Sequence, residues 1–397
     1  MSNPLLSAAR TDPWIDWGKA LASQCIVWHH LAHYGPLAAR FRPVMPRTLD
    51  WLDQRALWAV QVFLVMAGYL AARSLWPQPG QPRLTLRQWP AKLAHRWRRL
   101  VPLYLAALAL AVLCAALARL WMDDADTPAA PAADQLLAHL LMAQDVVGQP
   151  ALSAGVWYVA IDLQLFALLA ALAGLTALAG GRPPAVAAPW RGRLRVRPLY
   201  PPAPRPLQGA AAWRQAACAM VLVGGLALAS LLAFNLDADG DMWATYFFGA
   251  YALGVLAAWG GYGGHRLGWA VLIVLLATAA LWLQWRDRVL LASLVALALL
   301  WRPGARQLAA STVQPLVAWL ARVSYALFLV HYPVSLALNA AFEHFLPAHA
   351  WLAGLGLLLT WLVSLMLAWG LTRLLEPRPK GARQPVPPAG AVHAAGA

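Results

Sequence analysis

Charged residues are scarce in this chain. Only 12% of its 397 residues are Asp, Glu, Lys or Arg, while 61% are hydrophobic. An ordinary soluble domain has roughly 25% charged residues. A soluble fold of this length could not cover so much apolar surface with so few charges. The composition therefore excludes an ordinary soluble globular protein and indicates that lipid is part of the solvent.

Cysteine is also rare, and each of the three lies where oxidation is not expected. Cys25, Cys114 and Cys218 all fall within apolar stretches and none in a connection predicted to face outward. We predict no disulfide and no thiolate metal site. The opening residues lack an apolar core and a cleavage site, so we expect no cleaved signal peptide.

Apolar runs with few charges recur along the chain, and most have the roughly 20 residues that a helix needs to cross a bilayer. They predict an all-α fold, a polytopic integral membrane helix bundle with about ten transmembrane helices. The run at 288–301 is short for a span. The runs lie at about 18–35, 56–76, 100–121, 156–179, 213–234, 243–260, 267–284, 288–301, 317–339 and 350–372.

Acidic residues are missing from the connections that carry arginine. Segments 77–99 and 181–214 hold Lys and Arg without an acid, whereas 122–155 holds Asp without Lys or Arg. The positive-inside rule then places the arginine-rich connections and both termini in the cytoplasm. Only the first outer connection, 36–55, departs from this pattern, with four arginines and two aspartates.

The net charge of +15 is distributed between the apolar runs. Nucleic-acid binding would need those basic residues on one folded face, so we predict no nucleic-acid partner. We interpret residues 1–375 as one transmembrane domain and 376–397 as a disordered cytoplasmic tail, because the tail is rich in proline and small residues.

Ionisable residues within a membrane are costly and are functional candidates by default. His30 follows Lys19 by eleven residues, about 16 Å along a helix, which places His29 and His30 in the outer half of the bilayer. A desolvated, neutral imidazole can take a proton from a hydroxyl as a general base. There are two alternatives to a general base. One is a histidine with a structural role, and the other is a metal or haem site that uses His29 and His33.

Four other polar residues stand out. Arg96 and Arg99 share a helix face and could clamp the phosphates of a nucleotide-bearing donor, or simply anchor the topology. Asp162 lies in an otherwise apolar run, where orienting a histidine and pairing with an arginine are equally compatible with burial. His331, ahead of Pro333, serves chemistry or satisfies the turn that the proline opens.

Four stretches, in this order along the chain, resemble acyltransferase family three, the integral membrane acyltransferases that modify bacterial surface glycans and some lipids or antibiotics. The family's first pattern is an Arg, ten residues and a His, and it is similar to Lys19 and His30, with Asp16 at the family's preceding Asp. The family's R-x-x-R ahead of a proline looks like Arg96, Arg99 and Pro102, and its Trp-then-Glu stretch resembles Trp157 to Asp162. The family's late S-Y-x-x-Y-L-x-H-x-P is similar to Ser324, Tyr325, Phe328, Leu329, His331 and Pro333.

The chain departs from the family pattern at several places. Lys19 replaces an arginine, which keeps the charge and loses the fork geometry, and Asp162 replaces a glutamate with a shorter arm. The pattern V-D-x-F-F-x-x-S-G-F is only partly kept, because Gln61 and Ala67 replace its Asp and Ser.

The resemblance implies ten core helices in a bacterial inner membrane and acyl transfer from cytoplasmic acyl-CoA, acetyl-CoA or another short one, with no metal. The acceptor it implies is a hydroxyl compound such as a cell-surface or exported glycan. His30, His29 and Asp162 would be catalytic, with Asp162 fixing the tautomer of the ring, and Arg96, Arg99 and Lys19 would bind the donor. The competing hypothesis is a transporter or flippase that uses buried His and Asp as a proton relay.

Overall fold

The computed structural model describes residues 12–76, 84–179, 210–262 and 265–375, and within these ranges the chain forms helices and no strand. Most of the arginine-rich connection 181–214 and all of the predicted tail 376–397 lie outside the described residues. The helices are α1 (Pro13–His33), α2 (Pro36–Phe41), α3 (Pro46–Arg55), α4 (Val60–Leu75), α5 (Trp89–Trp121), α6 (Ala133–Leu140), α7 (Val156–Ala179), α8 (Ala210–Leu232), α9 (Ala244–Tyr262), α10 (Arg266–Leu283), α11 (Asp287–Trp301), α12 (Ala305–Ala310), α13 (Gln314–Phe345) and α14 (Ala350–Leu375).

Each of the ten apolar runs forms one long helix, namely α1, α4, α5, α7, α8, α9, α10, α11, α13 and α14. Among the described residues, 7 helical segments are long and apolar enough to cross a membrane. The prediction of an all-α polytopic membrane bundle is therefore confirmed. The number of ten spans stays a prediction.

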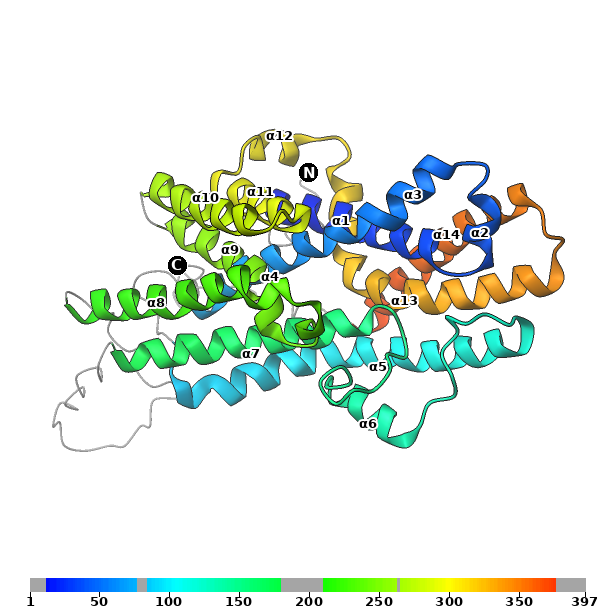
Figure 1. The fold of residues 1–397 in the computed structure, drawn as a ribbon, viewed down its shortest axis with the longest axis horizontal. Coiled ribbons are helices and arrows are strands. Elements are labelled where there is room, and N and C mark those ends of the chain that lie inside the picture. The colour runs from blue at the N-terminus through cyan, green and yellow to red at the C-terminus, as the bar shows by residue number, and fades with distance from the viewer. Residues whose placement is uncertain (1–11, 77–83, 180–209, 263–264, 376–397) are drawn as a thin grey trace, which may run out of the picture.

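The long helices lie mostly along the longest axis of the molecule (Figure 1). Helices α4 and α8 to α11 gather toward one end of this view, and α2, α3, α13 and α14 toward the other, while α5 and α7 run along one side. Helix α1 packs against both α13 and α4, so it joins the two groups. The predicted histidines lie near the C-terminal end of this connecting helix.

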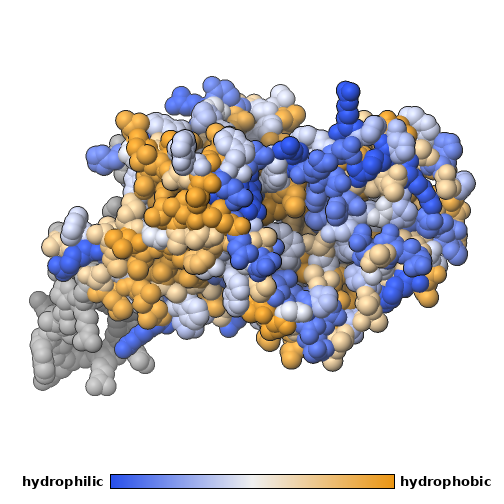
Figure 2. Space-filling model, viewed as in Figure 1, coloured by the Kyte–Doolittle hydropathy of each residue, from blue (hydrophilic) through white to orange (hydrophobic). Residues whose placement is uncertain are grey.

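The molecular surface separates apolar from polar regions along the same axis. On the face shown in Figure 2, apolar side chains gather over the end that holds α8 to α11, and polar side chains gather over the end that holds α2 and α3. Large apolar side chains project outward there, including Trp282 at 91% exposure and Val221 at 71%. Contiguous exposed apolar surface of this kind is what lipid covers in a membrane protein.

Helices α4 and α9 approach so closely that their backbones touch. A Cβ at Gly68 would lie 1.9 Å from the carbonyl oxygen of Tyr251, and one at Gly254 would lie 1.9 Å from that of Val65. Any larger residue would force the helices apart, because backbone atoms cannot yield as a flexible side chain does. Small residues at a helix crossing are the usual means of close packing within a membrane.

The connection 36–55, whose four arginines departed from the charge pattern, folds into α2 and α3 and pairs three of those arginines with acids. Arg42 contacts both Asp50 and Asp53, Arg40 lies 2.5 Å from Glu343, and Arg55 lies 3.1 Å from Asp287. Two of these carboxylates come from distant parts of the chain. These ion pairs tie α2 and α3 to α11 and α13.

Helix α6 is held by a fully buried histidine that must be neutral. The Nδ1–H of His139 donates to the carbonyl of Gln135 at 2.8 Å, and its Nε2 accepts from the N–H of Leu152 at 3.1 Å. Burial lowers the pKa of His139 below the ordinary value of 6.5. The neutral ring therefore stabilises the connection fully above pH 6.5, and this stabilisation is lost as the pH falls through the folded-state pKa.

We expect acid to open this connection before the membrane helices unfold. Hydrogen exchange of residues 133–152 should be faster at pH 5 than at pH 7 after correction for the intrinsic rate. A His139→Gln variant, which does not titrate, should lose that pH dependence. Equal protection of the segment in the native protein at both pH values would contradict this assignment.

Candidate active site

Two histidines from distant parts of the chain stack on each other inside the bundle. His30 lies on α1 and His331 on α13, and their ring centroids are 4.9 Å apart with an interplanar angle of 28°. Both are buried, with 6% of His30 and 0% of His331 exposed. The pairing follows from the packing of α1 along α13.

Each ring of this pair has a buried nitrogen without a hydrogen-bond partner among the described residues, Nδ1 of His30 and Nε2 of His331. Nδ1 of His331 lies 3.1 Å from the carbonyl oxygen of Leu327. In the neutral ring that nitrogen carries the proton and donates it to the carbonyl, so Nε2 has the lone pair. An unsatisfied buried acceptor is costly, and it is the group that a general base needs.

Two further histidines extend the pair toward α3. His29 lies 4.8 Å from His30 and 5.5 Å from His33, measured between ring centroids. Nδ1 of His29 is 3.2 Å from the carbonyl oxygen of Leu52, and Nδ1 of His33 is 2.7 Å from Asp53. Helix α3 thus fixes the orientation of both rings, and His33 reaches the surface with 49% of its side chain exposed.

Two tyrosines complete the surroundings of the pair. Tyr34 stacks on His30 at 5.5 Å and contacts the ring of Tyr332 at 5.1 Å. The hydroxyl of Tyr332 donates to the carbonyl of Asp126, at 2.8 Å, in the connection between α5 and α6. Aromatic rings therefore lie between the histidine pair and the acidic connection that joins α5 to α6.

Asp162 pairs with an arginine, which is one of the two roles that the sequence left open. Nη2 of Arg96 donates to both of its carboxylate oxygens, at 2.7 and 2.6 Å. The same guanidinium lies over the ring of Phe166 at 4.6 Å. Arg96 thus turns into the bundle, and no contact between Asp162 and any of the histidines is found among the described residues.

A layer of aromatic side chains lies between this ion pair and the histidines. Tyr158 precedes Asp162 by one turn of α7, and its ring lies 5.3 Å from Phe328. Phe328 in turn lies 6.1 Å from His331, and Phe63 of α4 contacts both Tyr158 and Phe328. Aromatic side chains from α4, α7 and α13 therefore separate the Arg96–Asp162 pair from the histidine pair.

The remaining predicted donor-binding residues lie apart from this interior. Arg99 is exposed on α5, one turn beyond Arg96, and no described residue bonds its guanidinium. Lys19 is half-buried near the start of α1 and has an interaction within the protein. The structure therefore does not bring Arg96 and Arg99 together as a pair, because their side chains face different surroundings.

Within the described ranges, no group of three or more His, Cys, Asp or Glu side chains converges as a metal site would require. The Nδ1 atoms of His29 and His33, the pair considered for metal or haem, are engaged by Leu52 and Asp53.

The role of His331 could not be fixed from sequence. Its two interpretations, chemistry or satisfaction of an opened turn, both fit a histidine two residues before a proline. Its stacking on His30 joins positions 301 residues apart, which only the packing of α1 against α13 reveals. The signal available in the sequence was that His331, like His30, lies in an apolar run.

The comparisons with known proteins identify a family. A family model described as an acyltransferase domain, that of acyltransferase family three, matches residues 12–369. No curated protein and no solved structure matches the chain.

Proposed function

Since the chain belongs to acyltransferase family three, it is a membrane acyltransferase, and we propose that it moves an acetyl or other short acyl group from cytoplasmic acyl-CoA to a hydroxyl acceptor. The acceptor would be a cell-surface or exported glycan or a compound of similar chemistry. One observation carries the proposal, the stacked pair His30 and His331 with a buried ring nitrogen on each that no described residue satisfies.

The pair is suited to accept one proton. Two imidazolium charges with centroids 4.9 Å apart would repel strongly in a water-poor interior, so the pair holds at most one extra proton at a time. One ring can therefore take the proton of an acceptor hydroxyl while its neighbour stays neutral. The same proton is then available to the departing thiolate.

The reaction closes without a further reagent. The acceptor hydroxyl gives its proton to a ring nitrogen of the pair, and its oxygen attacks the thioester carbonyl. The carbon–sulfur bond breaks, and the thiolate of coenzyme A takes the proton back. In a second route a ring nitrogen of His30 attacks the carbonyl and the carbon–sulfur bond breaks. The acyl group then passes from the ring to the acceptor oxygen, and the proton of the acceptor goes to the thiolate of coenzyme A. The products in both routes are an ester and free coenzyme A.

The donor enters, in this proposal, from the predicted cytoplasmic end of α5. Arg99 is exposed there and has its guanidinium available for a phosphate. The pantetheine arm would then pass the Arg96–Asp162 pair and the aromatic layer to reach His30. Phe63, Tyr158 and Phe328 offer this arm an apolar wall.

We expect Arg99→Ala to raise the KM for acyl-CoA about tenfold, since one charge-assisted contact to phosphate is lost. Arg98→Ala is the matched control, because Arg98 is an exposed neighbour on the same helix and the two variants lose the same charge. A KM for acyl-CoA that stays at the native value in both variants would indicate that both arginines only anchor the topology.

Reconstitution tests the proposed function directly. Proteoliposomes holding the full chain would be supplied with radiolabelled acetyl-CoA on one side and a panel of hydroxyl compounds on the other. We expect label in an ester product and release of coenzyme A. Proton-coupled flux of a solute without consumption of acyl-CoA would instead support the transporter hypothesis.

A further inference from the structure

Two buried polar groups lie at the Arg96–Asp162 pair and have no hydrogen-bond partner among the described residues, the Nε of Arg96 and the hydroxyl of Tyr251. Tyr251 belongs to α9, and 0% of the residue is exposed. Its phenol is close enough to Arg96 and Asp162 to interact electrostatically with both. The two unpartnered groups therefore belong to one polar cluster inside the bundle.

The packing of three helices brings this cluster together. Helix α7, which carries Asp162, packs against α5, which carries Arg96, and against α9. Tyr251 is also the residue at which α9 touches α4, because its carbonyl oxygen would lie 1.9 Å from a Cβ at Gly68. The position of Tyr251 is thus fixed by helices on two sides.

Arg96 has donors that the ion pair leaves unused. Its Nη2 donates to both carboxylate oxygens of Asp162, at 2.7 and 2.6 Å. A guanidinium also carries an N–H on Nε, and in the described part of the chain no acceptor takes it. A buried donor without an acceptor costs stability, and in native proteins such a group usually bonds to water or to a ligand.

The cluster is neutral overall, which decides the ligand chemistry that it suits. The carboxylate of Asp162 offsets the charge of Arg96, and a bound phosphate or carboxylate would be repelled by that carboxylate. A neutral amide avoids this repulsion. Its carbonyl can accept from the Nε–H of Arg96, and the hydroxyl of Tyr251 can donate to the carbonyl or accept from the amide N–H.

The cluster borders the aromatic layer that lies between it and the histidine pair. Tyr158 interacts electrostatically with Asp162, Arg96 and Tyr251, and its ring centroid lies 5.3 Å from that of Phe328. The ring of Phe328 lies 6.1 Å from that of His331. A flexible chain that extends from the cluster to the histidines therefore runs along Tyr158 and Phe328.

The proposed donor has amides in the part of the molecule that must pass this point. The pantetheine arm of acyl-CoA carries secondary amides between its phosphates and its sulfur. An amide that enters a helix bundle loses its water and needs hydrogen-bond partners in the protein. The Nε–H of Arg96 and the hydroxyl of Tyr251 are suitable partners, and both are free in the protein without donor.

We propose that Arg96 Nε and the hydroxyl of Tyr251 bind an amide of the pantetheine arm and thereby align the thioester with the histidine pair. The inference rests on the proposed function for the identity of the donor, and it adds Tyr251 to the donor-binding residues. Pantetheine binding can be measured without an acceptor, so failure of this site and failure of acyl transfer are distinguishable.

The test compares donors that keep or lack the amides, with the full chain in proteoliposomes. Acetyl-CoA and S-acetylpantetheine carry the amides, and S-ethyl thioacetate does not. We expect Tyr251→Phe to lower kcat/KM about tenfold for the two amide donors, because one hydrogen bond is lost, and to change it less than about twofold for S-ethyl thioacetate. A native kcat/KM with S-acetylpantetheine would overturn the proposal, and so would an equal loss with all three donors.

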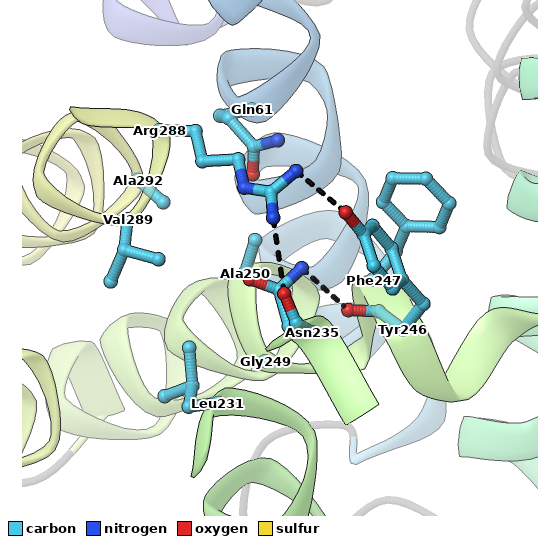
Figure 3. A pocket seen from close by; sticks show the side chains of 10 residues that line it. All are labelled: Gln61, Leu231, Asn235, Tyr246, Phe247, Gly249, Ala250, Arg288, Val289 and Ala292. Carbon is cyan, nitrogen blue, oxygen red and sulfur yellow. Dashed lines mark hydrogen bonds between the residues drawn. The ribbon is translucent and has the colours of Figure 1, made fainter. Parts of the chain in front are cut away.

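Tyr246→Phe is the matched control on the same helix. Tyr246 is 5% exposed, and its hydroxyl has a partner, since it accepts from Arg288 Nη1 at 2.6 Å in the pocket that Figure 3 shows. This variant should keep the native kcat/KM for every donor and lower the thermal unfolding midpoint. Tyr251→Phe should not lower the midpoint, because it removes no hydrogen bond that the described residues make.

Two further variants separate the amides from the phosphates. Arg96→Lys keeps a positive charge for Asp162 but lacks the Nε–H of a guanidinium, so it should lower kcat/KM for both amide donors. Arg99→Ala should weaken the use of acetyl-CoA and leave that of S-acetylpantetheine unchanged, because pantetheine has no phosphate.

Equilibrium binding of labelled pantetheine to the full chain, without any acceptor, tests the site independently of acyl transfer. We expect Tyr251→Phe to bind pantetheine about tenfold more weakly than the native protein. Native affinity in Tyr251→Phe would overturn the site even if the native protein transfers acyl groups. Weakened binding in a chain that consumes no acyl-CoA would support the site and refute the proposed function alone.

Discussion

A His30→Ala variant is expected to fold normally and to lose acyl transfer by about 10²- to 10⁴-fold in kcat, the usual contribution of general acid–base catalysis. Its ring lies against His331, and Nδ1 has no partner among the described residues, so its removal breaks no hydrogen bond of that atom. The measurement is steady-state release of coenzyme A by reconstituted protein, with the KM for acyl-CoA determined in parallel.

The control for His30→Ala is His349→Ala, because His349 is exposed in the connection before α14 and far along the chain from α1. This variant should retain the native turnover. The turnover of His331→Ala should be reduced as that of His30→Ala is. The double variant should turn over only a little more slowly than either single variant, since the effects of residues that act as a unit are not additive. Near-native turnover of His30→Ala would remove the histidine pair from the mechanism.

Helix positions were predictable because lipid imposes a simple rule on them. A chain segment of about 20 residues that crosses hydrocarbon must satisfy its own backbone and carry few charges, and both requirements are visible in sequence. All ten apolar runs accordingly coincide with helices. Helices α2, α3, α6 and α12 were not predicted, because they lie in connections where no such requirement acts.

The contact partners of individual side chains were much harder to predict than the positions of the helices. His30 was singled out as a polar residue in an apolar run, but nothing in one sequence says that α1 packs on α13 and brings His331 to it. Asp162 was equally compatible with a histidine or an arginine, and the choice depends on how α5 and α7 are placed side by side. Contacts between distant segments are decided by three-dimensional packing, which periodicity does not encode.

Gln61 illustrates a third kind of limit. From sequence it was only a departure from the family pattern in the second apolar run. Its meaning depends on Arg288, which lies 227 positions later and in the structure lines the same pocket. A substitution that removes a negative charge can be interpreted only when the positive charge it would have faced is known.

The ion pair between Arg96 and Asp162 is expected to dominate stability within the bundle. Removing one partner of a buried pair leaves an uncompensated charge and costs about 3–5 kcal/mol. The side chains here are only 27% and 10% exposed. Arg96→Met and Asp162→Leu should each lower the free energy of unfolding by about that amount, as measured by denaturation in mixed micelles.

The double variant Arg96→Met/Asp162→Leu separates structure from donor binding. Two apolar side chains of similar volume replace the pair and leave no lone charge, so stability should return to within about 1–2 kcal/mol of the native protein. If the pair is purely structural, the KM for acyl-CoA should return as well. If Arg96 also contacts the donor phosphates, the refolded double variant should keep a KM raised at least tenfold. A double variant as unstable as the single ones would show that the two charges do not depend on each other.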